Sequence, residues 1–301
     1  MQRIMPYLAA ASVAVLKLAL ARMRPGDRAW LARRLMRDRF APAEKAFATF
    51  CELSVHAWKN RQYDVRLNGE EALLRRLAPF RPRIVFDVGA NVGEWSLNAA
   101  RLLADATIHA FEIAPETART LAANAAAAGR IVVNPIGLSD RSGTVTIYLD
   151  PADSTSTSTV EIEDPGGGRR TMVRNAVATE ARVTTGDAYL EAAGIEAIDL
   201  LKIDVEGAEK SVLDGFAGTF ARGGIGMVQF EYGVRNAQTG VLLKHFYRFF
   251  TERGFVLGKI YPEGVAFKDY AFEDEDFVGP NYLAVHRSRA EAIDALRCPV
   301  P

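Results

Sequence analysis

The sequence predicts an α/β protein with a doubly wound, mostly parallel sheet and an N-terminal helical extension. From residue 82 onwards, short apolar runs rich in β-branched residues alternate with longer runs of helical periodicity. Such alternation builds a parallel sheet that helices cover on both faces. The first 60 residues carry helical patterns alone. We therefore expect a basic helical extension over residues 1–65 and the main domain over residues 66–301.

The composition is that of a globular enzyme. The chain has 301 residues, of which 49% are hydrophobic and 25% charged, so it can bury a sizeable core. Its net charge is zero, which gives no reason to expect a nucleic-acid partner. Cys51 and Cys298 lie far apart and make neither a disulfide framework nor a zinc pattern. A reducing, cytoplasmic compartment is the simplest interpretation.

The charge is unevenly distributed along the chain. Residues 1–40 contain nine Lys or Arg and two Asp, a net charge of +7. The stretch 4–23 is apolar and helix-prone, but Lys17 interrupts it, and a membrane span needs about 20 apolar residues. A signal peptide is disfavoured, because a cytoplasmic type of enzyme follows. We expect a helix packed on its own domain or on a second subunit. The alternative is a peripheral contact with anionic lipid at the inner face of the membrane.

The expected elements follow one another along the chain in a regular order. The predicted strands are 83–88, 107–113, 131–138, 143–149, 197–205, 225–233, 255–261 and 281–286. The predicted helices are 27–40, 43–58, 94–104, 115–128, 208–216 and 241–254. Residues 150–181 are rich in Ser, Thr and Gly. They are interpreted as a surface loop with at most a short hairpin, or as a lid over a substrate.

The stretch Phe86–Ser96, FDVGANVGEWS, places a glycine turn between a strand and a helix. Glycine allows a sharp turn and close approach of a ligand to the backbone. The dinucleotide fingerprint would need glycine at positions 91 and 94, where Asn91 and Glu94 stand. The turn is therefore a poor match to an NAD site.

Acidic residues stand at successive strand ends, where doubly wound sheets bind their ligands. They are Asp87, Glu112, Asp140, Asp204 and Glu231. This pattern suits S-adenosylmethionine. Asp87 is expected to accept bonds from its ammonium group, Glu112 from both ribose hydroxyls and Asp140 from the adenine amino group. The start of the helix at Glu94 suits the carboxylate.

Five motifs together resemble the FkbM-type methyltransferases: FDVGANVGEWS, IHAFEIAPE, NPIGLSDRSGTVTIY, DLLKIDVEGAE and VQFEYG. The resemblance runs from about residue 84 to 286, and DLLKIDVEGAE is its most specific part. It implies the Rossmann-like class I methyltransferase fold and methylation of a hydroxyl on a sugar, a glycolipid or a natural product. The expected cofactor-binding residues are Asp87, Gly89, Ala90, Asn91, Gly93, Glu112, Ile113, Ser139, Asp140 and Asp204.

Methylation of an alcohol needs a base or a metal ion near the oxygen. The expected catalytic residues are Lys202, Asp204, Glu206 and Glu231. Lys202 and Asp204 share one face of their strand, because they are two residues apart. If the strands of Asp204 and Glu231 are neighbours, the two carboxylates converge. Together they could hold Mg²⁺, or one of them acts as general base without a metal.

Two other classes of function stay open from the sequence. An NAD(P)-dependent oxidoreductase or epimerase would have the same alternation of strands and helices, but the glycine spacing of this sequence does not match the dinucleotide fingerprint. A non-catalytic scaffold with a relic nucleotide site would be expected to have lost one of the five acids. The expected partner is a small hydroxylated molecule rather than nucleic acid, and a homo-oligomer is compatible with the sequence.

Overall fold

The computed structural model describes residues 15, 17–150, 153–158, 162–163, 169–170 and 177–300. Contacts divide the chain into two units, one up to Trp58 and one from Lys59 onwards. The first unit contains helices α2 (Pro25–Leu35) and α3 (Pro42–Trp58), and no residue of these two described helices is buried. Most of the apolar stretch 4–23 lies outside the described residues. Among those described, no helix is long and apolar enough to cross a membrane.

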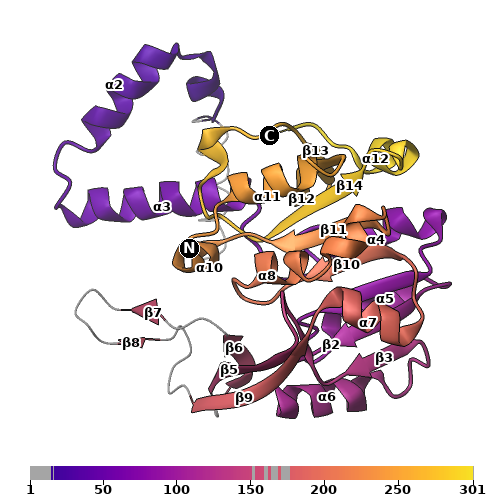
Figure 1. Ribbon diagram of the computed structural model, residues 1–301. Coiled ribbons are helices and arrows are strands. Elements are labelled where there is room, and N and C mark those ends of the chain that lie inside the picture. Colours follow the sequence, from indigo (N-terminus) through magenta and orange to yellow (C-terminus); the bar gives the residue numbers. More distant parts are fainter. Residues whose placement is uncertain are drawn as a thin grey trace. The chain divides into compact units, whose positions relative to one another are not determined.

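The second unit is built on a large sheet that has eight strands within the described chain (Figure 1). In spatial order the strands are β13 (Gly264–Phe267), β12 (Phe255–Tyr261), β14 (Asn281–His286), β11 (Ile225–Glu231), β10 (Ile198–Ile203), β1 (Ile84–Val88), β2 (Thr107–Phe111) and β3 (Ile131–Asn134). The five strands from β11 to β3 are parallel. Strand β14 runs antiparallel between β11 and β12. This is the expected mostly parallel, doubly wound sheet.

Successive residues of the central strands enter different cores, as the two-residue period of a strand requires. Val85 and Leu200 pack with α4 (Glu70–Leu77), α5 (Glu94–Leu102) and α12 (Ala290–Leu296). Phe86 and Leu201 pack with the opposite set, which is α7 (Gly186–Ala193), α8 (Glu209–Asp214), α9 (Ala217–Ala221) and α11 (Leu243–Thr251). Both faces of the sheet are therefore buried. The other described helices of this unit are α6 (Pro115–Ala125), α10 (Val234–Thr239) and the 3₁₀ turns η1 (Ala78–Phe80) and η2 (Phe272–Asp274).

The predicted strand 131–138 is wrong as a single element. Strand β3 ends at Asn134, because Pro135 has no N–H to continue the ladder. Gly137–Leu138 (β4) belongs to a second sheet, of order β4-β9-β5-β6, with β5 at Gly143–Asp150, β6 at Asp153–Ser158 and β9 at Val177–Thr184. The carboxyl end of the expected surface loop is thus a strand paired with β5. Within that loop, β7 (Ile162–Glu163) pairs with β8 (Arg169–Arg170).

Candidate active site

The turn after β1 lies against the turn after β10. Gly89 has φ +80°, and a Cβ on it would lie 1.8 Å from the backbone carbonyl oxygen of Asp204. Any other residue there would push the two turns apart. Gly93, with φ +93°, begins α5, and a Cβ on it would lie 2.6 Å from Leu121 Cδ1. Glycine is therefore favoured by packing against backbone and by conformation at position 89, and by conformation at position 93.

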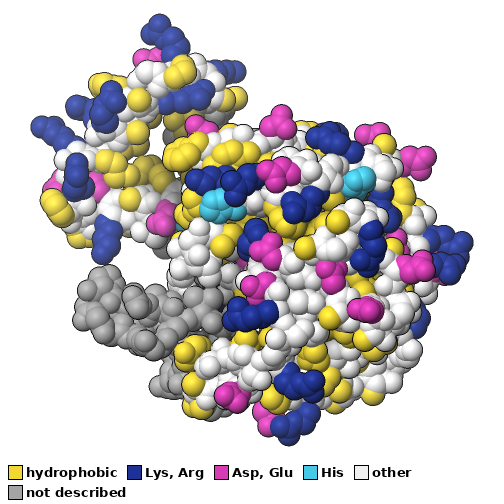
Figure 2. All heavy atoms as spheres, viewed as in Figure 1, with side chains coloured by type: hydrophobic (Ala, Val, Ile, Leu, Met, Phe, Trp, Pro, Cys, Tyr) yellow, Lys and Arg dark blue, Asp and Glu magenta, His cyan; other side chains and the backbone are white. Residues whose placement is uncertain are grey.

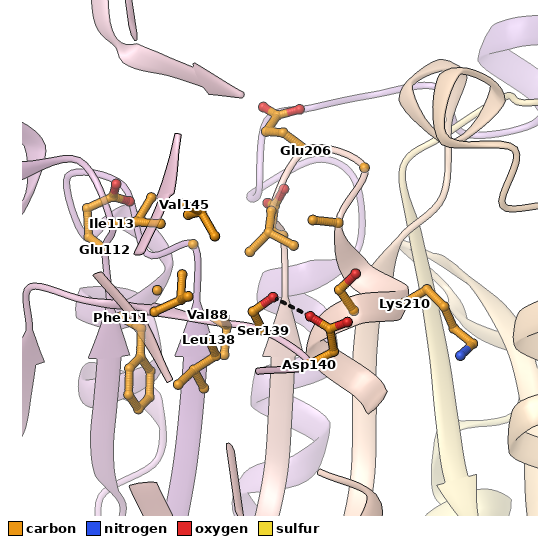
Figure 3. A pocket seen from close by; sticks show the side chains of 18 of the residues that line it. Val88, Phe111, Glu112, Ile113, Leu138, Ser139, Asp140, Val145, Glu206 and Lys210 are labelled. Atoms are coloured by element: carbon orange, nitrogen blue, oxygen red, sulfur yellow. Dashed lines mark hydrogen bonds between the residues drawn. The ribbon is translucent and has the colours of Figure 1, made fainter. Parts of the chain in front are cut away.

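A first cavity of about 800 Å³ opens at the carboxyl ends of β1, β2 and β4. Figure 3 shows Glu112 and Ile113 at the end of β2, and Ser139 donating to Asp140 nearby. Glu112 is buried, and its two carboxylate oxygens accept the backbone N–H groups of Asn91 at 2.9 Å and Ala114 at 2.8 Å. Burial raises the pKa of Glu112 despite these bonds. The cavity thus combines an apolar wall with one oriented carboxylate.

A second cavity of about 600 Å³ lies beside the first and shares four lining residues with it: Gly89, Asn91, Asp204 and Glu206. Its other side is formed by the end of β11 and the segments around Tyr63 and Asn281. Glu231 ends β11 and is opposite Asn281 in the sheet. The two cavities therefore meet where the turn after β1 touches the turn after β10.

Lys202 lies at the centre of a row of buried polar residues. Asp87, Lys202 and Gln229 pair across β1, β10 and β11, so they share one face of the sheet. Lys202 Nζ lies 3.1 Å from Asp87 Oδ1 and 3.3 Å from Asp204 Oδ2. Burial alone would lower the pKa of Lys202, but the charges of Asp87 and Asp204 outweigh it and raise that pKa. Lys202 therefore stays charged and fixes both carboxylates.

Two further carboxyl groups of the second cavity resist ionisation. Burial is the largest cause, and the neighbouring charge of Asp204 adds to it. The pKa of Glu206 rises to about 7 although Arg235 forms an ion pair with it. The pKa of Glu231 rises well above its ordinary value. The side chain of Glu231 makes no hydrogen bond or ion pair with any described residue, so its carboxyl group is available to a ligand.

The structure brings most of the expected site residues together. Glu112, Ile113, Ser139 and Asp140 line the first cavity, whereas Ala90, Lys202 and Glu231 line the second. Two expected residues line neither cavity, Asp87 and Gly93. Asp87 has no exposed surface, and its carboxylate accepts from Ser96 Oγ at 2.6 Å and from Lys202. A direct bond from Asp87 to an ammonium group stays a prediction, and its observed partners lie within the protein.

Sequence reasoning missed the floor of the second cavity. Glu70 is buried, and its carboxylate accepts from the amides of Asn68 at 2.6 Å, Gln229 at 2.6 Å and Asn281 at 2.9 Å. Glu70 precedes the region of family resemblance, which begins near residue 84. The available signal was a polar residue inside an apolar strand, which is Gln229 in the run IGMVQFE.

Among the described residues, no group of three or more His, Cys, Asp or Glu could hold a metal ion. Asp204 and Glu231 do lie on neighbouring strand ends and line the same cavity, as expected. A metal site built on these two residues has no third protein ligand of those types in the described chain.

Comparison with known proteins identifies the domain. The model of the Methyltransferase FkbM domain family matches residues 87–257, which is more than half of the chain. The hexuronic acid methyltransferase AglP of Haloferax volcanii is 28% identical, with 56% of this chain and 65% of that protein covered. The 31-O-demethyl-FK506 methyltransferase FkbM of Streptomyces tacrolimicus is 34% identical, with 48% and 64% covered. The chain spans less than two thirds of the length of these relatives.

Solved methyltransferase structures are also similar. The methyltransferase FkbM of Methylobacillus flagellatus has 16% identity and a TM-score of 0.39, covering 70% of this chain and 48% of that one. The O-methyltransferase TomG of Streptomyces achromogenes has 14% identity and a TM-score of 0.41, covering 91% and 96%. The family match covers residues 87–257, which include the glycine turn after β1 and the turn after β10, so the chain belongs to the FkbM family of S-adenosylmethionine-dependent methyltransferases.

Proposed function

We propose that the protein transfers a methyl group from S-adenosylmethionine to a hydroxyl of a small molecule, such as a sugar, a glycolipid or a natural product. One observation carries this proposal: two cavities of different lining meet at Gly89, Asn91, Asp204 and Glu206. A transfer reaction between two substrates needs such a junction. It holds donor and acceptor in contact and keeps bulk water out.

The first cavity fits the cofactor. Phe111, Ile113 and Leu138 supply apolar surface for adenine. Glu112 keeps lone pairs free beyond its two backbone bonds, so it can accept both ribose hydroxyls. Ser139 and Asp140 offer polar atoms at the adenine end. When bound there, S-adenosylmethionine supplies an electrophilic methyl group.

The second cavity would hold the acceptor. We assign to Glu231 the removal of the proton from the acceptor hydroxyl, and this assignment is supported by a carboxyl group that lines the cavity and that no described residue occupies. A raised pKa makes this carboxylate a stronger base once it is ionised. Lys202 and Glu206 are assigned supporting roles. Lys202 forms an ion pair with Asp204 at the junction, and Glu206 with Arg235 lines the cavity wall.

Two relatives support a hydroxylated small molecule as acceptor. One is a hexuronic acid methyltransferase and the other a 31-O-demethyl-FK506 methyltransferase. The alternative to a carboxylate base is a Mg²⁺ ion, held by Asp204 and Glu231, that activates the hydroxyl. EDTA separates the two routes. Activity that survives EDTA and is not raised by added Mg²⁺ assigns the proton to a carboxylate alone.

A second proposal concerns the N-terminal unit. It takes up the alternative given above, that residues 1–40 contact anionic lipid. Neither of its described helices buries a residue, and Trp30, Leu35 and Phe40 are exposed beside several arginines. Figure 2 shows basic and apolar side chains interspersed over these helices. Exposed apolar groups among cations suit an anionic membrane surface.

The test of the main proposal is thermal unfolding with S-adenosylhomocysteine, with NAD⁺ as control. A ligand at about 100 times its dissociation constant adds roughly 2.7 kcal/mol to the unfolding free energy. Stabilisation by S-adenosylhomocysteine alone supports the proposal. Stabilisation by NAD⁺ alone would instead favour the oxidoreductase or epimerase, and the absence of both would favour a scaffold.

A further inference from the structure

The second cavity is strongly acidic. Its lining contains five carboxylic acids, Glu70, Glu94, Asp204, Glu206 and Glu231, and two cations, Lys202 and Arg235. Both cations already have carboxylate partners. Lys202 bridges Asp87 and Asp204, and Arg235 pairs with Glu206. Among the described lining residues, no cation is left to neutralise a negatively charged ligand.

The floor of this cavity is an ordered surface of amides and a carboxylate. Three side-chain amides donate to Glu70, which fixes their orientation. One buried polar atom of a lining residue, Nε1 of Trp95, has no partner among the described residues. Trp95 lines the cavity, and Lys202 Nζ lies 5.6 Å from the centre of its ring. An unpartnered donor in the lining suits a ligand that presents an acceptor oxygen, such as that of a hydroxyl group.

We propose that the second cavity takes a saccharide ring or cyclic polyol that is neutral or carries an ammonium group, and that it rejects uronates and sugar phosphates. The inference rests on the proposed function and narrows its acceptor. Hydroxyl groups can bond to the amides of the floor and to Glu231 at once. An anionic substituent would lose its hydration in a lining whose two cations are already paired with carboxylates, which disfavours its binding.

The test uses sets of acceptors that differ only in charge. Methyl galactoside, its 2-amino analogue, its uronate and its 6-phosphate form one set, and the corresponding glucosides form the second. The 301-residue chain is supplied with S-adenosylmethionine, and kcat/KM is measured from S-adenosylhomocysteine formation. We expect a neutral or amino member to exceed its anionic counterparts at least tenfold.

Equal or faster methylation of a uronate or a phosphate would overturn the proposal. The absence of turnover on every member, by protein that binds S-adenosylhomocysteine, would overturn the saccharide assignment as well. Protein that does not bind S-adenosylhomocysteine refutes the proposed function itself, so the two failures are distinguishable.

A charge variant tests the electrostatic cause independently of folding. Glu94 is an exposed residue in the first turn of α5 and lines the cavity. Glu94→Lys should raise the ratio of uronate to neutral kcat/KM at least fivefold, because it places a cation at the cavity wall. Glu291→Lys is the matched control, since Glu291 is exposed in the first turn of α12 and outside the cavity. An equal ratio in both variants would contradict the charge argument.

Discussion

Lys202 Nζ lies 3.1 Å from Oδ1 of Asp87, a carboxylate with no exposed surface, and the pair stands at the centre of the sheet. The same ammonium group reaches Asp204, which lines both cavities. One buried cation therefore connects the packing of β1 and β10 to the place where the two cavities meet. Stability and site geometry depend on the same group.

Removing this cation should destabilise the fold strongly. In Lys202→Met, Asp87 stays buried without its charged partner, and breaking a buried ion pair in this way costs about 3–5 kcal/mol. Urea unfolding followed by circular dichroism measures the loss. The double variant Asp87→Asn, Lys202→Met removes both charges and should recover part of it. A loss below about 1 kcal/mol in the single variant would contradict the assigned role.

Replacing Gly89 should destabilise the protein through a steric clash with the turn after β10, in addition to the cost of its backbone conformation. Gly89→Ala places a Cβ 1.8 Å from the carbonyl oxygen of Asp204, whereas a Cβ on Gly129, with φ +63°, meets nothing within 4 Å. Gly129→Ala should lose about 1–2 kcal/mol through its left-handed conformation. Gly89→Ala should lose at least twice as much in urea unfolding, and should lose affinity for S-adenosylhomocysteine. Equal losses would mean that the turn can relax.

The sheet could be predicted from the sequence because each strand and helix is marked by a pattern of neighbouring residues. Each central strand is a short apolar run followed by an acid or a glycine, and helical periodicity separates the runs. The convergence of Asp204 and Glu231 was expected on the condition that their strands are neighbours, and β10 and β11 do pair in parallel. The glycine turn likewise followed from Gly89 and Gly93 standing between strand and helix.

The features that were not predicted depend on contacts between segments that are far apart in the sequence. Glu70 is 159 residues from Gln229 and 211 from Asn281, and no local pattern shows that their side chains meet. Asp87 could be placed at a strand end, but its turn towards Lys202 depends on the register of β1 with β10. Strand β9 was hidden because β-pairing with β5 overrides its polar composition.

Glu112 should govern cofactor affinity. Glu112→Gln keeps the size of the side chain but replaces one acceptor oxygen with a donor, which then faces the backbone N–H of Asn91 or Ala114. We expect S-adenosylhomocysteine to bind at least tenfold more weakly by calorimetry. Glu116→Gln is the control, because Glu116 is exposed on α6 and lines neither cavity. Unchanged affinity in Glu112→Gln would remove Glu112 from the cofactor site.

Glu206 should make stability depend on pH. Its pKa is about 7 in the folded protein, against an ordinary value of 4.5, chiefly through burial. A raised folded-state pKa means that its stabilising contribution is complete below about pH 4.5 and is lost as pH rises through about 7. Glu206→Gln should therefore raise Tm relative to the parent more at pH 8 than at pH 5. Exposed Glu263, changed to Gln, serves as control. A Tm difference that is independent of pH would argue against a raised pKa.

The N-terminal unit should bind anionic vesicles in a salt-dependent manner. Its first 40 residues carry a net charge of +7, and Trp30 and Phe40 are exposed at 57% and 89%. The 301-residue chain should sediment with phosphatidylglycerol vesicles at low salt, and less at high salt, because salt screens the attraction between arginines and lipid phosphates. Phosphatidylcholine vesicles are the control. Trp30→Ala should weaken sedimentation at both salt concentrations, because it removes apolar contact without changing charge. Protein that stays in the supernatant at low salt would refute the membrane contact while leaving the methyltransferase site untouched.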